Sequence, residues 1–148
     1  RMSVAPLPLA IASHFRVLSI GLDLGAMIVR PPLALAIRLT ANDLIGPELL
    51  VVETAAAIVR QFRLGSLQRS LAERLLADAH AVFKHRSISL EPDAGLLPRA
   101  EEIAIALSHP LQDCLYVACA EAAGAELVTT DGALVKRASS TFSFVKQF

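Results

Sequence analysis

The chain has 148 residues, of which 54% are hydrophobic and 19% are charged, with 14 basic and 14 acidic residues. This length and apolar content argue against intrinsic disorder and predict one domain over residues 1–148. The net charge of zero excludes attraction of nucleic acid by a global basic field, and it favours an obligate partner or a dimer.

The first apolar stretch, residues 4–12, is short and contains Pro6 and Pro8, so it is a poor secretion signal. Charged residues interrupt the apolar sequence that follows, and no run reaches the roughly 18 residues of a membrane span. We therefore expect neither secretion nor a membrane partner.

The N-terminal half begins with a strand that ends just before an acidic residue, Asp23. The expected elements are a strand over 17–22, a short helical turn over 24–29, a helix over 32–40 and a short strand over 44–45. Pro31 and Pro32 separate the two helical segments, because proline lacks the N–H that a helix interior needs. Gly46-Pro47 predicts a turn before the next helix.

Two amphipathic helices are expected in the middle of the chain. Apolar residues at helical spacing predict the first over about 47–62, with Gly65 after its end. Ser66 is the expected N-cap of the second helix, whose apolar stripe runs from Leu67 to Phe83.

The C-terminal half continues the alternation of strands and helices. The expected elements are strands over 87–90, 126–130 and 142–145, and helices over 96–107, 111–123 and 133–138. This alternation predicts an α/β layer fold with a mostly parallel sheet. Sites in such sheets lie beyond the carboxyl ends of strands, where Asp23 and Asp131 fall.

The remaining chemically versatile side chains are interpreted as structural. Cys114 and Cys119 lie on one helix and are expected to be free, buried thiols of a reducing, cytoplasmic compartment. Tyr116, the only tyrosine, is expected in the core or an interface. The four histidines show no ligand spacing; they are His14, His80, His85 and His109.

Four acidic residues stand in apolar surroundings: Asp23, Glu53, Asp113 and Asp131. A lone carboxylate is costly to bury, and several that converge repel one another unless a hard divalent cation lies between them. Mg²⁺ or Mn²⁺ in such a site activates water and stabilises charge on a phosphodiester. The chain has no glycine-rich phosphate loop and no nucleophile elbow that would indicate another chemistry.

Each acid also has an ordinary structural interpretation. Asp23 and Asp113 suit the first turns of helices, and Asp131-Gly132 is a favourable turn dipeptide. Glu53 suits the solvent face of an amphipathic helix. A phosphatase with an aspartate nucleophile is a further alternative, but it needs a second aspartate soon after the first, which Leu24-Gly25 does not supply.

The sequence LQDCLYVA at 111–118, followed by GAELVTTD at 124–131, resembles the C-terminal half of PIN domains of the VapC toxin type. Residues 47–50 followed by Glu53 resemble the second acidic motif of that family. Its first motif is a strand ending in aspartate, then a small residue and a hydroxyl residue. Here Asp23 would match, with Gly25 at the hydroxyl position. A rival register places the first strand at 2–5, where no aspartate exists.

The resemblance implies a three-layer α/β/α fold and an endoribonuclease that depends on Mg²⁺ or Mn²⁺. It implies that Asp23, Glu53, Asp113 and Asp131 hold the metal and act in catalysis, with Thr130 supporting a carboxylate or a phosphate. It further implies RNA as substrate, a cognate antitoxin as partner in a type II toxin–antitoxin pair, and a homodimer. The alternative is a degenerate, inactive PIN fold that binds nucleic acid or protein.

Overall fold

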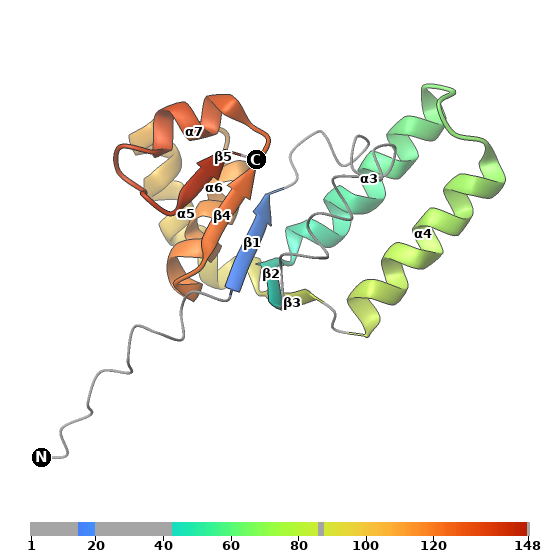
Figure 1. The fold of residues 1–148 in the computed structure, drawn as a ribbon, viewed down its shortest axis with the longest axis horizontal. Helices are drawn as coiled ribbons and strands as arrows, with labels where there is room; N and C mark the ends of the chain where they lie inside the picture. The colour runs from blue at the N-terminus through green and yellow to red at the C-terminus, as the bar shows by residue number, and fades with distance from the viewer. Residues whose placement is uncertain (1–14, 20–42, 86–87, 148) are drawn as a thin grey trace, which may run out of the picture.

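Five parallel strands form the centre of the molecule (Figure 1). The structure is a computed structural model, and it describes residues 15–19, 43–85 and 88–147. The strands are β1 (Phe15–Ser19), β2 (Asp43–Pro47), β3 (Ile88–Glu91), β4 (Glu126–Thr129) and β5 (Val145–Gln147). They are ordered β3-β2-β1-β4-β5, and every pairing among these described strands is parallel, which confirms the predicted sheet type.

Strand β1 holds the central position of the sheet, between β2 and β4. It begins two residues before the predicted strand over 17–22, and Ser19, its last described residue, pairs with Thr129. The predicted helical segments over 24–29 and 32–40 lie outside the described residues, as do Asp23 and the rival strand over 2–5.

A helical hairpin follows β2, made of α3 (Leu49–Arg63) and α4 (Arg69–Lys84). The two helices pack through a small apolar core that includes Ile58, Leu67 and Ala72, which confirms the predicted amphipathic pair. The predicted N-cap role of Ser66 is wrong. Its backbone N–H instead donates to the carbonyl of Gln61 and closes the end of α3, so α4 begins only at Arg69, after an N-cap residue whose side chain makes no capping hydrogen bond.

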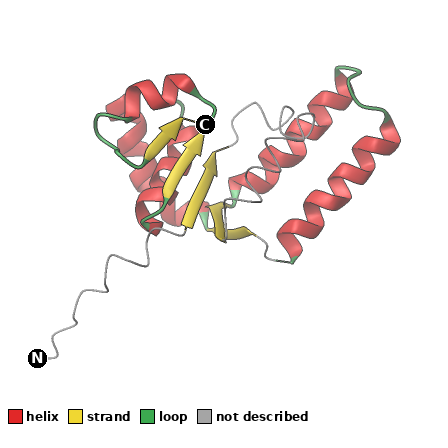
Figure 2. Cartoon of the chain, in the orientation of Figure 1, coloured by secondary structure: helices red, strands yellow, loops and turns green. Residues whose placement is uncertain are grey.

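Helices α5 (Asp93–Leu107), α6 (Leu111–Ala123) and α7 (Gly132–Ala138) complete the fold. The crossover from β2 to β3 runs across the sheet in the opposite direction to those from β3 to β4 and from β4 to β5. Because such crossovers are right-handed, the α3–α4 hairpin lies on one side of the sheet, next to β2 and β3, and α5, α6 and α7 lie on the other side (Figure 2). The result is the predicted three-layer α/β/α arrangement.

Helix α6 is the centre of the larger core. It contacts β1, β2, β4 and α5, and every residue from Cys114 to Ala120 is buried. Both cysteines are free thiols there, as predicted. This packing fixes the position of the helix, whose first turn carries Asp113.

Several ends of predicted elements differ from the structure. Gly46 and Pro47, predicted as a turn, are the last residues of β2 and pair with Leu90 and Glu91 of β3. Helix α5 begins at Asp93 rather than at residue 96, and the Asp93 Oδ1 atom accepts a hydrogen bond from the backbone N–H of Leu49 at 3.1 Å. This contact supplies α3 with a cap worth about 1 kcal/mol from a residue 44 positions away. The predicted strand over 142–145 is wrong in position, because Phe142 lies in the turn after α7 and packs edge-to-face on Phe144.

Within the described part of the chain, no single helix has the length and apolarity of a membrane span. Only α5 and α6 taken together meet that test, and they are bent by 118° relative to one another.

Candidate metal centre

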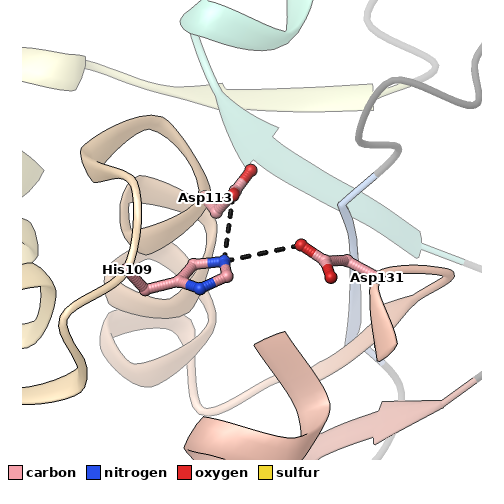
Figure 3. Close-up of side chains that lie close together, drawn as sticks. All are labelled: His109, Asp113 and Asp131. Atoms are coloured by element: carbon pink, nitrogen blue, oxygen red, sulfur yellow. Dashed lines mark ion pairs between the residues drawn. The ribbon is translucent and has the colours of Figure 1, made fainter. Parts of the chain in front are cut away.

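Three side chains converge beyond the carboxyl end of β4: His109, Asp113 and Asp131 (Figure 3). The Nε2 atom of His109 lies 3.0 Å from Oδ2 of Asp113 and 3.4 Å from Oδ2 of Asp131. One nitrogen or oxygen from each residue lies within 4.8 Å of the others, and we call these residues the His–Asp–Asp group. Two acids that are 18 positions apart in the sequence therefore meet where β4 ends and α6 begins.

Asp131 both caps a helix and faces the group. Its Oδ1 atom accepts hydrogen bonds from the backbone N–H groups of Ala133 and Leu134 at 2.9 and 3.1 Å, at the start of α7. Its own N–H donates to the Oγ1 atom of Thr129, which is 1% exposed. The ordinary interpretation of Asp131 as a turn residue is thus correct, but it uses only one carboxylate oxygen and leaves Oδ2 directed at His109.

Thr129, rather than Thr130, is the threonine that positions Asp131. The side chain of Thr129 points back at the Asp131 backbone, whereas Thr130 offers its carbonyl to Nε2 of Gln147 at 3.4 Å. Thr129 is the last residue of β4, whereas Thr130 lies beyond the strand, so the two threonines have different surroundings.

Asp113 lies in the first turn of α6, as its ordinary interpretation predicts, and it is partly buried. Burial raises the pKa of the Asp113 carboxyl, the charge of Asp131 raises it further, and the neighbouring His109 opposes both effects. Burial and the neighbouring charge therefore disfavour the ionised form of Asp113, and a bound cation would stabilise it.

Glu53 reaches the same region from α3 and is held by Tyr116 of α6, whose hydroxyl donates to Oε2 of Glu53. Burial raises the pKa of Glu53, its hydrogen bond to Tyr116 lowers it, and the charges of Asp113 and Asp93 raise it again. Burial and the Glu53 carboxylate together raise the pKa of the Tyr116 hydroxyl. Glu53 is therefore within electrostatic range of Asp113, and its interpretation as a solvent-facing residue is wrong.

Sequence reasoning missed the two partners that organise these acids. Tyr116 is buried as expected, at 1% exposed, but its hydroxyl also serves Glu53. His109 had been interpreted as structural. Tyr116 follows Asp113 by three residues within α6, so these two share one side of that helix. His109 lies before α6, outside any helix, so helical spacing does not relate it to the acids.

The donor set fits a divalent cation. The negative charges that raise the pKa values of Glu53 and Asp113 belong to other carboxylates, so the local charge is in excess. Carboxylate oxygens are the usual ligands of Mg²⁺ and Mn²⁺, and the tightest contacts lie in the His–Asp–Asp group. Of the four predicted acids, Asp113 and Asp131 come together, Glu53 lies nearby, and Asp23 is outside the described residues.

Comparison with known proteins identifies the class of this fold and site. The family model of the PIN domain matches residues 25–139, more than half of the chain, so the chain belongs to the PIN-domain family. The matched segment includes Glu53, Asp113 and Asp131 and begins two residues after Asp23. PIN domains are generally metal-dependent nucleases.

The crystal structure of PAE2754 from Pyrobaculum aerophilum has the same fold. It matches over 91% of each chain, with a TM-score of 0.64 and 19% sequence identity. At that identity the likeness concerns the fold alone. No curated protein has a matching sequence.

Protonation of Glu53 is predicted to stabilise the metal-free fold. Its pKa in the folded chain is raised above the ordinary value of 4.5, so the folded state binds this proton more tightly than the unfolded state. The stabilisation is fully present below 4.5 and is lost as the pH rises through the folded pKa. Urea unfolding in EDTA should therefore show the wild type gaining stability relative to Glu53→Gln as the pH falls from about 7. A difference that is constant with pH, or that shrinks on acidification, would contradict this assignment.

Proposed function

We propose that the protein is a Mg²⁺- or Mn²⁺-dependent endoribonuclease. The observation that carries the proposal is the convergence of Asp113 and Asp131, with Glu53 coupled to Asp113 through its charge. Half-buried acids that repel one another destabilise the metal-free fold, and a bound divalent cation would offset this cost. Membership of the PIN-domain family supports phosphodiester hydrolysis as the use of that cation.

The chain's residues have distinct roles in this proposal. Asp113 and Asp131 would hold the cation, and Glu53 would complete the site directly or through water while Tyr116 fixes its orientation. When bound, the cation supplies the positive charge that activates water and stabilises charge on the phosphodiester. Asp23 would add a fourth carboxylate: it follows Ser19 by four residues, a reach of up to about 14 Å, and Ser19 pairs with the strand that leads to Asp131.

The chain has no net charge, so it cannot attract RNA through an overall positive field. Binding of RNA phosphates would therefore depend on basic side chains close to the acids. Arg60 is exposed on α3 and follows Glu53 by seven residues, which places it two turns further along the same side of the helix. We assign it to the RNA backbone. Thr130, beside Asp131, would contact a carboxylate or a phosphate.

We further propose that the enzyme is the toxin of a type II toxin–antitoxin pair, that it acts in the cytoplasm, and that it forms a homodimer. Exposed apolar side chains on α3 support a protein partner: Val52, Val59 and Phe62 are 66%, 43% and 43% exposed. Light scattering of the purified chain should give twice its 15.8 kDa mass. A monomer at every concentration would contradict the dimer.

Cleavage of RNA is the direct test. With Mg²⁺ or Mn²⁺, the wild type should cut a mixed RNA substrate, and Asp113→Asn should lower the rate by about 100-fold or more, because an amide cannot replace a metal-bound carboxylate. Asp78→Asn is the matched control, since Asp78 is exposed on α4 far from the acids in sequence, and it should keep wild-type activity.

Two results would overturn the nuclease proposal. One is equal cleavage by the wild type and Asp113→Asn, and the other is cleavage that persists in EDTA. No cleavage together with unchanged thermal stability in Mn²⁺ would favour a degenerate PIN fold that binds nucleic acid or protein.

A further inference from the structure

The side chain of His109 is buried, and its Nε2 atom faces the carboxylates of Asp113 and Asp131. It is 6% exposed, and its Nε2 atom is buried without a hydrogen-bond partner of standard geometry in the described part of the chain. Unpaired buried polar atoms are rare because they forfeit their hydrogen bonds to water. This atom nevertheless lies 3.0 and 3.4 Å from two carboxylate oxygens.

The fold holds His109 firmly at this place. It stands between α5 and α6, directly after Ser108, whose backbone adopts the left-handed conformation with φ of 49°. The guanidinium of Arg137 on α7 donates to the carbonyls of Leu107 and Ser108. The corner that carries the imidazole is thus fixed by the helix that Asp131 caps.

The two separations from the His109 Nε2 atom match those of neighbouring ligands around one ion. Ligands about 2.1 Å from a six-coordinate cation lie about 3 Å apart when they are adjacent. The two separations from Nε2 fall close to that value. Figure 3 shows this nitrogen directed into the space between the two carboxylates.

We propose that His109 is a direct ligand of the divalent cation, together with Asp113 and Asp131, and that it favours Mn²⁺ over Mg²⁺. The inference rests on the proposed metal-dependent function and adds a nitrogen ligand to an otherwise acidic site. Imidazole binds transition metals well, whereas Mg²⁺ takes oxygen ligands and keeps its water. The nitrogen therefore discriminates between two ions that carboxylates alone treat alike.

Electron spin echo envelope modulation of Mn²⁺ bound to the full chain tests the nitrogen directly. The wild type should show ¹⁴N modulation from a coordinated imidazole, and His109→Asn should lose it. The matched control is His80→Asn, an exposed histidine on α4, which should keep the modulation. Titration should show Mn²⁺ affinity reduced about 10-fold or more in His109→Asn, with a smaller change for Mg²⁺.

Several outcomes would overturn the proposal. If the wild type binds Mn²⁺ without ¹⁴N modulation, the proposal is wrong, and this result is decisive even if His109→Asn fails to fold. The proposal is also wrong if His109→Asn keeps the wild-type ratio of Mn²⁺ to Mg²⁺ affinity. It is wrong too if His109→Asn binds both ions more tightly, which would identify His109 as a positive charge that competes with the cation. RNA cleavage without ¹⁴N modulation refutes this ligand alone, and ¹⁴N modulation without cleavage refutes the nuclease function alone.

Discussion

Repulsion among half-buried carboxylates is the constraint on which this site depends. Glu53 and Asp113 are each partly removed from water, and each has a pKa raised both by burial and by the charge of another carboxylate. The fold tolerates them because separate contacts hold each one: the Tyr116 hydroxyl donates to Glu53, and the Nε2 atom of His109 lies 3.0 Å from Oδ2 of Asp113. A cation between them would convert this repulsion into attraction.

The architecture explains how acids far apart in the sequence meet. Helix α6 packs against the sheet and α5, and this packing positions Asp113 in its first turn and Tyr116 in its second. Strand β4 leads directly to Asp131, and α3 brings Glu53 across from the other face of the sheet. The three acids come from the first turns of helices or the end of a strand, where side chains are positioned by rigid backbone rather than by long loops.

Much of this fold was predictable from local pattern. The bounds of α6 match the predicted helix over 111–123, because Pro110 and Gly124 mark its ends. The hairpin of α3 and α4 followed from apolar spacing. The C-terminal strand was misplaced, since the alternating Phe142 and Phe144 imitate a strand while they pack as a turn against the core.

The site was predictable only in its acids. Carboxylates in apolar segments are conspicuous, so Asp113, Asp131 and Glu53 could be selected from sequence. Their partners could not, because the pairing of Tyr116 with Glu53 joins residues 63 positions apart, and the burial of His109 depends on three helices. Tertiary contacts of this kind leave no local pattern.

The central claim is that these acids form one divalent-cation site. Anomalous diffraction from crystals of the full chain grown with Mn²⁺, measured on both sides of the manganese absorption edge, tests it most directly. The account predicts a strong peak within about 2.5 Å of carboxylate oxygens of both Asp113 and Asp131. A map with no peak there, or with manganese bound only elsewhere on the chain, would contradict it.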